Sequence, residues 1–422
     1  MSATPTSRPS IQARELPATR AAVAMFGLLL VAYAVNAMDR MVFPVLLVEV
    51  RAEYGFSLEA AGLQATVFAL GMGLAGLPAG RLQRALGRKR TIVAGTVLFS
   101  VATALTAAST GFGDMLLWRV LSGAGEALQL AAIITVASNA FPARRGLAIG
   151  SINMAFAAGS VVGPAFGASL LEHYGTWRAP MLAYGAVGIV LAAAVVLLVS
   201  PRLTEAEPAT ATAAHTGGAT SLLSRNPLVL AAVIVLFGLA DFAFIGLYAS
   251  YLRAELGFDS GAAGFVVGLS GLAAFASPLG GHLVDRFSPR VVLAGLNLAV
   301  AACGCALFLG PGSAGWQGAF SFLFGLFASS GVYVAAAGYL VKSVDAANVS
   351  RAAGMFVTCV YVAASAAGLL FSSLVSTAGW TGAALVQIVG FSAVGAVLAL
   401  ILRPHLFSTT APVTTTPVRD DS

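Results

Sequence analysis

The feature that most limits how this chain can fold is a series of twelve apolar runs, each about 20 residues long. A helix of that length crosses the ~30 Å hydrocarbon core of a bilayer. The composition agrees, because only 9% of the residues are charged, against roughly 25% in soluble domains. The sequence therefore predicts an all-α integral membrane protein with twelve transmembrane helices. We place these at residues 22–48, 60–79, 91–109, 115–139, 147–171, 179–199, 228–250, 262–280, 291–310, 317–340, 352–375 and 382–402.

Polar segments divide the runs into two groups of six. We expect residues 1–20 to form a disordered cytoplasmic tail, residues 201–227 a cytoplasmic linker and residues 404–422 a second disordered cytoplasmic tail. The segments between them, 21–200 and 228–403, would each form a six-helix bundle. Eighteen of the 23 arginines and lysines fall on the side of the termini and three on the opposite side. The positive-inside rule therefore predicts that both termini are cytoplasmic.

An internal repeat relates the two groups. Arg51-Ala-Glu-Tyr-Gly-Phe56 recurs as Arg253-Ala-Glu-Leu-Gly-Phe258, an offset of 202 residues that also relates Asp39 to Asp241. Six spans followed by six related spans of the same orientation form a parallel repeat, in which substrate sites lie near the bilayer midplane between the halves. We therefore expect two pseudo-symmetric bundles, with Asp39 and Asp241 facing each other across the symmetry axis.

Five charged side chains interrupt the apolar runs, and they are Asp39, Arg40, Arg119, Glu126 and Asp241. A charge at the centre of a membrane helix costs roughly 2.5–3.5 kcal/mol on insertion scales, so such residues usually face a cavity. A carboxylate can change its protonation when its hydration or its distance from a guanidinium changes. An arginine stays charged and can hold a carboxylate through two parallel hydrogen bonds. The alternative is a static ion-pair network, Asp39–Arg119 or Arg40–Glu126, that only fixes the bundle.

Other polar side chains on apolar runs give weaker signals. They are either substrate contacts or ordinary hydrogen bonds between helices, and they are Gln64, Tyr248, Tyr333 and Tyr361. The three cysteines lie inside apolar runs, and the four histidines are far from any metal-ligand spacing. We therefore expect no metal site and no cofactor.

Two loops in equivalent places carry a shared pattern. The first reads Gly80-Arg-Leu-Gln-Arg84-Ala-Leu-Gly87-Arg88-Lys-Arg90, and the second reads Gly281-His-Leu-Val-Asp285-Arg286-Phe-Ser-Pro-Arg290. Both resemble the signature Gly-x-Leu-x-Asp-Arg-x-Gly-Arg-Lys of the major facilitator superfamily. The resemblance implies the major facilitator fold, twelve transmembrane helices in two six-helix bundles, and a gating role for these residues. Asp285 and Arg286 fit the cytoplasmic lock of that family. Arg84 stands where the first aspartate is usual, so the basic residues there could serve only to set the topology.

The fifth run carries glycines at one-turn spacing, Gly159, Gly163 and Gly167, with Pro164 between them. Such glycines allow close contact between helices, and the proline kinks the span. The pattern resembles the fifth-helix motif of the drug antiporters in the family. Helix packing alone also explains it.

The fourth run contains Arg119 and Glu126, which are two turns apart and therefore share a helix face. Together with Asn36, Asp39 and Arg40 on the first run, they resemble the anion:cation symporter branch of the family. That resemblance implies that Asp39 and Glu126 carry protons while Arg40, Arg119 and Asn36 hold an anion. The same segments are also similar to the spinster lipid-transporter branch.

The function predicted from these residues is proton-coupled symport of a small organic anion by alternating access. Asp241 would line the opposing wall as a further proton-coupling group. The alternative is a proton-driven efflux antiporter for drugs or amphipathic lipids. No metalloprotease, serine hydrolase or nucleotide-binding motif occurs in the sequence, which argues against an enzyme and against ATP as the energy source. We expect a monomer in a cell membrane, with a bacterial inner membrane favoured, that binds its substrate, protons and lipid but no nucleic acid.

Overall fold

The computed structural model describes residues 19–56, 58–206, 218–258 and 260–408. Both predicted tails lie largely outside these ranges, and so do residues 207–217 of the predicted linker. Over the described ranges the chain is helical almost throughout. The helices of the first half are α1 (Thr19–Tyr54), α2 (Leu58–Leu86), α3 (Arg88–Thr106), α4 (Phe112–Ala140), α5 (Arg145–Tyr174), α6 (Arg178–Leu198) and the short α7 (Pro201–Thr204). Those of the second half are α8 (Arg225–Ala254), α9 (Ser260–Ala273), α10 (Ser277–Arg286), α11 (Pro289–Leu309), α12 (Ala314–Gly325), α13 (Val334–Lys342), α14 (Val349–Ala384) and α15 (Phe391–Leu400).

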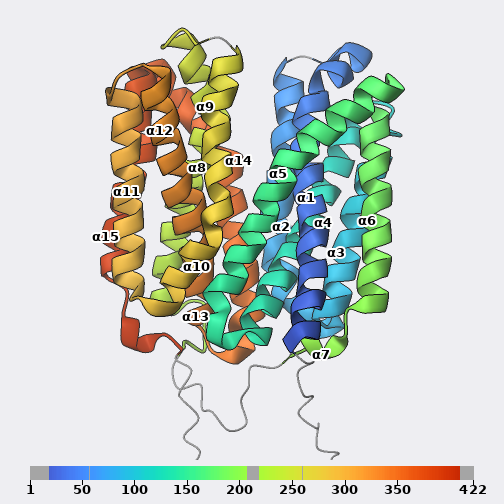
Figure 1. Ribbon diagram of the computed structural model, residues 1–422, viewed down its shortest axis with the longest axis vertical. Helices are drawn as coiled ribbons and strands as arrows, with labels where there is room; N and C mark the ends of the chain where they lie inside the picture. The colour runs from blue at the N-terminus through green and yellow to red at the C-terminus, as the bar shows by residue number, and fades with distance from the viewer. Residues whose placement is uncertain (1–18, 57, 207–217, 259, 409–422) are drawn as a thin grey trace, which may run out of the picture.

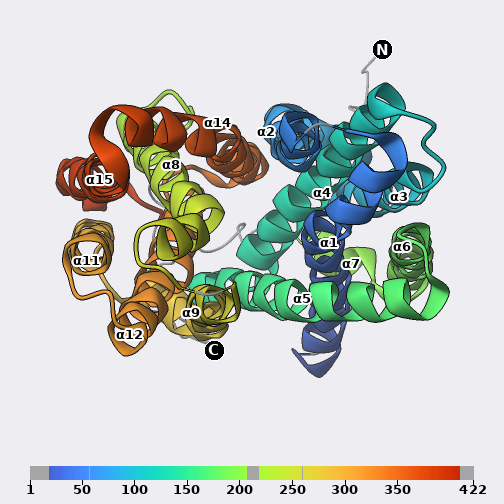
Figure 2. The same cartoon turned by 90° about the horizontal axis from the view of Figure 1, so that it is seen from above.

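The predicted all-α membrane fold is confirmed. Helices α1 to α6 form one group and α8 to α15 the other (Figures 1 and 2). Within the described residues, nine helical stretches are long and apolar enough to cross a membrane. The halves meet where α2 packs on α14 and α5 packs on α10.

Several long helical stretches of the second half contain an irregular segment or a break. A 3-10 turn at Ala274–Ala276 joins α9 to α10, and a π-helical segment at Leu326–Tyr333 joins α12 to α13. Gly379 takes φ 70° inside α14 and so separates two membrane-crossing segments. A positive φ of this size favours glycine, because other residues meet a steric penalty there.

The repeat is also visible in the backbone. Gly55 ends α1 with φ 66° and Gly257 follows α8 with φ 69°. These glycines are 202 residues apart, which is the offset found between the two sequence segments. The shared left-handed turn supports the repeat as a structural one.

Helix α5 packs closely on α1 through its glycines. A Cβ atom at Gly159 would lie 2.1 Å from the Ala34 carbonyl oxygen, and one at Gly163 would lie 2.6 Å from the Met38 Cα. At Gly167 a Cβ would lie 2.2 Å from a Val42 methyl group. This packing fixes the middle of α1, which carries the charged residues, against α5.

The two halves are in contact at the end that carries the loops 81–90 and 286–290, which we call the basic-loop end. A Cβ at Gly146 would lie 2.1 Å from the Gly281 carbonyl oxygen, and one at Gly80 would lie 2.8 Å from the Arg351 Cα. Toward the opposite end the two groups of ribbons diverge (Figure 1), and a Cβ at Gly264 or Gly268 on α9 would meet no neighbouring atom within 4 Å. The molecule is therefore closed at its basic-loop end.

Candidate functional site

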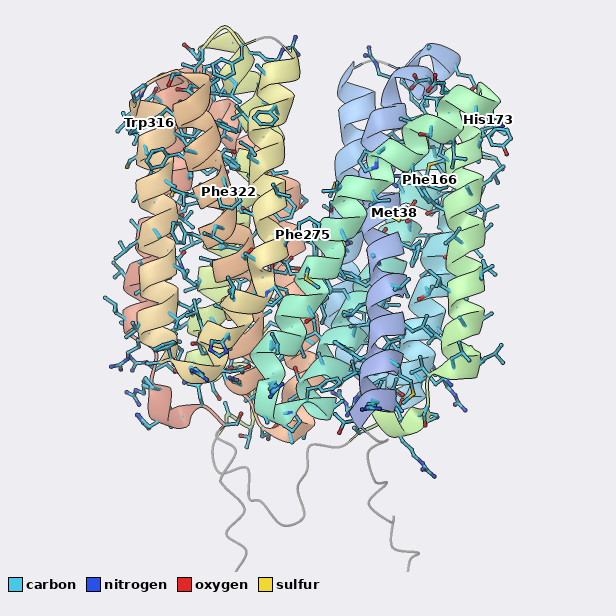
Figure 3. All side chains as sticks on the ribbon, in the orientation of Figure 1. Met38, Phe166, His173, Phe275, Trp316 and Phe322 are labelled. Carbon is cyan, nitrogen blue, oxygen red and sulfur yellow. The ribbon has the colours of Figure 1, made fainter. Side chains whose placement is uncertain are left out.

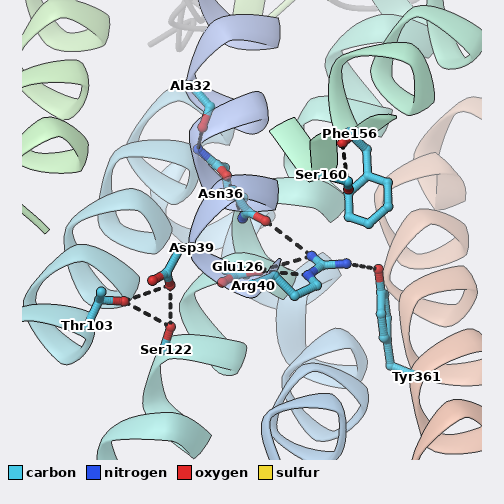
Figure 4. A network of polar contacts seen from close by, with 11 residues as sticks. Ala32, Asn36, Asp39, Arg40, Thr103, Ser122, Glu126, Phe156, Ser160 and Tyr361 are labelled. Atoms are coloured by element: carbon cyan, nitrogen blue, oxygen red, sulfur yellow. Dashed lines mark hydrogen bonds and ion pairs between the residues drawn. The ribbon is translucent and has the colours of Figure 1, made fainter. Parts of the chain in front are cut away.

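The middle of α1 places Asn36 and Arg40 on one face, since they are four residues apart. Arg40 Nη2 donates to Glu126 Oε2 at 2.9 Å and to Asn36 Oδ1 at 3.1 Å, and Arg40 Nε donates to Glu126 Oε2 at 3.2 Å. Arg40 Nη1 donates at 2.5 Å to the hydroxyl of Tyr361 on α14 (Figure 4). One guanidinium therefore joins a carboxylate of the first half to a tyrosine of the second half.

Aromatic rings surround this guanidinium. Its central carbon lies 4.9 Å from the centroid of the Phe156 ring, 5.1 Å from that of Tyr361 and 5.4 Å from that of Phe68. Such contacts hold a cation through the negative face of the ring. Tyr333 belongs to the same region, with its ring packed edge-on against Phe356 at 5.1 Å.

Asp39 is fully buried and points into the first half. Its Oδ2 accepts from Thr103 Oγ1 at 2.7 Å and from Ser122 Oγ at 3.1 Å (Figure 4). Its Oδ1 has no hydrogen-bond partner. The prediction that Asp39 and Asp241 face each other is therefore wrong, because Asp39 is turned toward α3 and α4. On a helix, the residue next to one that faces the partner half points about 100° away from it.

Arg119 is 1% exposed, and its Nε and Nη1 have no hydrogen-bond partner. The guanidinium lies 4.4 Å from the centroid of the Phe43 ring and 4.9 Å from that of Phe68. Of the two ion pairs considered from the sequence, the described residues contain Arg40–Glu126 but not Asp39–Arg119. Glu126 Oε1 also lacks a partner. The site thus holds two arginines and two carboxylates in which several polar atoms are buried without hydrogen bonds.

Besides Thr103 and Ser122, the site contains Gln129 and Thr96, which the sequence analysis did not single out either. Asn36 Nδ2 donates to Gln129 Oε1 at 2.8 Å, and Gln129 Nε2 donates to Thr96 Oγ1 at 2.9 Å. These two hydrogen bonds fix which end of the Asn36 amide faces Arg40. The signal for Gln129 was its position three residues after Glu126, on the same side of α4.

Three of the predicted residues lie away from this cluster. Gln64 donates to the Phe112 carbonyl oxygen at 2.9 Å, near the start of α4. Tyr248 donates to Gln317 Oε1 at 2.7 Å inside the second half. Both make the ordinary helix–helix hydrogen bonds that were the alternative interpretation. Asp241 is 7% exposed, and no hydrogen bond or ion pair joins its side chain to any described residue.

The basic-loop end carries the predicted gate. Asp285 on α10 accepts from the backbone N–H groups of Gly146 at 2.9 Å and Leu147 at 3.2 Å, at the start of α5. Lys342 Nζ lies 2.8 Å from Asp285 Oδ1. A carboxylate at a helix N-terminus satisfies free N–H groups and complements the helix dipole. Arg286, which was expected to take part in the lock together with Asp285, is exposed, and Lys342 is the cation that pairs with Asp285.

The loop of the first half is organised differently. Arg84 is exposed and makes no described contact. The backbone N–H groups of Arg88 and Lys89, at the start of α3, donate to the side-chain carboxylate of Glu205, which directly follows α7. Gly87 precedes them with φ 87°. In the second half Arg290 donates to the Leu402 carbonyl oxygen. The link between halves at this end therefore comes from Asp285 and from the close approach of Gly80 to α14.

No group of three or more His, Cys, Asp or Glu side chains that could hold a metal ion occurs in the described part of the chain. The charged side chains at the site can take part in ion pairing and proton exchange. Arg40 can exchange one anionic partner for another, and the carboxylates beside it can gain or lose protons as their surroundings change.

Comparison with known proteins gives a consistent result. The family model described as Major Facilitator Superfamily matches residues 29–368 and 230–418. The multidrug resistance protein MdtL of Klebsiella pneumoniae is 26% identical over 249 residues, 58% of this chain and 62% of that protein. The probable anion transporter 6 of Arabidopsis thaliana chloroplasts is 26% identical over 167 residues, 39% of this chain and 32% of that protein. Both matches span less than two thirds of the relative.

Among solved structures, the proton:xylose symporter XylE superposes with a TM-score of 0.70 at 12% identity. The superposition covers 90% of this chain and 95% of that one. At this identity the likeness concerns the fold, and it extends over nearly the whole of both chains. The family and the structural neighbour are transporters rather than enzymes. With the family model matching most of its length, this chain is a multi-pass membrane protein that belongs to the Major Facilitator Superfamily.

Proposed function

We propose that this protein is a secondary transporter that moves a small organic anion together with protons by alternating access. The moving units would be the bundles 21–200 and 228–403, joined by a cytoplasmic linker at 201–227, with cytoplasmic tails at 1–20 and 404–422. The protein would act as a monomer in a cell membrane, and we favour a bacterial inner membrane.

The observation that carries this proposal is the position of Arg40. Its guanidinium pairs with Glu126 of its own half and donates to Tyr361 of the other half. A substrate carboxylate has the same geometry as the Glu126 carboxylate and can replace it on the guanidinium. Protonation of Glu126 would release Arg40 for the anion, so that proton binding and anion binding support each other. Such mutual support is what coupling requires.

Asp39 and Arg119 supply a second, deeper pair of groups. Asp39 Oδ1 and two nitrogens of Arg119 lack partners in a fully buried region. Unsatisfied buried polar atoms carry a desolvation cost, so this arrangement favours a further proton or anion in at least one state of the cycle. The similarity to a probable anion transporter supports the same substrate class.

Proton-driven efflux of drugs or amphipathic lipids is the second candidate. The observation in its favour is Asp241, a buried carboxylate without a described partner in the second half. A cationic substrate could pair with it. The similarity to a multidrug resistance protein supports this candidate.

The test uses the full chain in proteoliposomes with Glu126→Gln. We expect the variant to exchange substrate across the membrane but to lose accumulation driven by a proton gradient, because the amide cannot titrate. Glu255→Gln is the matched control, since Glu255 is an exposed glutamate just after α8. Full accumulation by Glu126→Gln would remove Glu126 from the coupling mechanism.

A further inference from the structure

Apart from Arg40, the side chains that a ligand can reach at this site differ from those that form its hydrogen-bond network. Asn36, Glu126 and Gln129 are completely buried. Arg40 keeps partial exposure, with 9% of its side-chain surface accessible. Phe156 and Phe242 are likewise partly exposed, as is Tyr333. A molecule that approaches Arg40 therefore meets one cation and aromatic rings.

These rings come from both halves of the protein. Phe156 of α5 lies over the Arg40 guanidinium at 4.9 Å. From the second half, the Phe242 ring packs edge-on against Tyr361 with centroids 6.0 Å apart. Phe242 occupies the position that corresponds to Arg40 under the 202-residue offset. At equivalent positions the first half therefore has a charged side chain, Arg40, and the second half an aromatic one, Phe242.

Two of the polar groups that contact Arg40, the Asn36 amide and the Tyr361 hydroxyl, already have hydrogen-bond partners, and the unpaired Glu126 Oε1 is buried. The Asn36 amide uses its oxygen for Arg40 and its nitrogen for Gln129. The Tyr361 hydroxyl accepts from Arg40. A sugar acid carries several hydroxyl groups, each of which loses water on binding and needs a partner in return. An aromatic ring needs no such partner and gains from offset or edge contacts with other rings.

We propose that the anion bound here has an aromatic, apolar body, and that the site discriminates against polyhydroxylated acids of the same charge. Arg40 binds the anionic group, while Phe156 and Phe242 contact the body. This inference rests on the proposed function and names the substrate class of that same site.

Binding to the purified full chain tests it by isothermal titration calorimetry at pH 7.5. The probes are benzoate and D-gluconate, two monocarboxylates of equal charge, with tetraphenylphosphonium as an aromatic cation. We expect benzoate to bind at least about tenfold more tightly than gluconate, since ring contacts and unsatisfied hydroxyls act in the same direction.

The variants Phe156→Leu and Phe242→Leu each remove one ring and keep the site apolar. Each is expected to weaken benzoate binding by about threefold to tenfold and to leave gluconate binding within about twofold. The two positions lie in different halves, so one variant remains informative if the other does not fold. Phe166→Leu is the matched control. Phe166, labelled in Figure 3, lies on the same helix as Phe156 but is 43% exposed, and its ring packs on Tyr184.

Equal or tighter binding of gluconate overturns the inference but leaves anion transport intact. Tight binding of benzoate that both ring variants leave unchanged overturns it as well, because the rings would then not be the contact. Binding of tetraphenylphosphonium without either anion overturns the inference through failure of the proposed function itself.

Discussion

Replacing Asp285 by asparagine should open the basic-loop end of the protein. Asp285 accepts two backbone N–H groups at the start of α5 and pairs with Lys342 at 2.8 Å. The side chains of the pair are only 17% and 15% exposed, so water screens it little. An asparagine keeps one acceptor oxygen and loses the charge. The free energy that favours the closed over the open form should fall by roughly 2–3 kcal/mol. This corresponds to a decrease of about 30- to 150-fold in the ratio of closed to open molecules.

Double electron–electron resonance between spin labels can measure this change. The labels are attached at Arg84→Cys on α2 and Leu223→Cys just before α8, two exposed positions at the basic-loop end, in a background without the three native cysteines. We expect Asp285→Asn to shift the distance distribution toward longer values. Arg286→Gln, a change at the exposed neighbouring residue, should leave it unchanged. An unaltered distribution in Asp285→Asn would refute the assignment of Asp285 as the link between the halves.

Two further predictions concern stability. Hydrogen bonds from Arg178 and Trp177 lower the pKa of Glu53, beyond the apolar span of α1, below its ordinary value of 4.5. Ionised Glu53 therefore stabilises the folded state at pH values above its ordinary pKa. This stabilisation is lost as the pH falls through the lowered pKa of the folded state. Glu53→Gln should therefore lower the melting temperature at pH 7 but not near pH 3, with an effect below about 1 kcal/mol because the pair is exposed; a difference that persists at pH 3 would contradict this. Gly159→Ala should destabilise the protein by roughly 1–3 kcal/mol, because its Cβ would lie 2.1 Å from a carbonyl oxygen of α1. Gly264→Ala should be neutral, because the added Cβ would meet no neighbouring atom within 4 Å.

The twelve membrane helices could be predicted because hydropathy and length depend on the solvent rather than on the partners of each helix. The turn at Gly379 could be predicted as well, because it lies in the gap between the expected spans 352–375 and 382–402. An irregular segment inside a single expected span could not. The π-helical segment at Leu326–Tyr333 follows from packing and has no strong local signal.

The site was predictable where charge marked it and unpredictable where orientation mattered. Charged residues in membrane helices are rare and usually face a partner or a cavity, which pointed to Arg40 and Glu126. The rotation of α1 about its axis decides that Arg40 faces the second half while Asp39 faces Thr103. Helices buried on most sides show little amphipathic pattern, so the sequence contains no simple record of that rotation.

The neighbours of a charge were harder still to predict. Thr103 and Gln129 are common residues whose roles depend on helices far away in sequence. The cation that pairs with Asp285 is Lys342 at the end of α13, a residue outside the motif, and not Arg286. Such pairings require coordinates.

The most direct test of the central claim is whether a proton enters with the anion. The full chain is reconstituted in liposomes that contain a pH-sensitive dye, and a panel of anions and cationic amphipaths is added outside. Benzenesulfonate belongs in the panel, because a sulfonate stays charged at neutral pH and does not cross lipid by itself. We predict acidification of the lumen by one anion with the wild type and none with Asp39→Asn. Alkalinisation by a cationic amphipath would contradict symport and would make Asp241 the centre of an antiport mechanism.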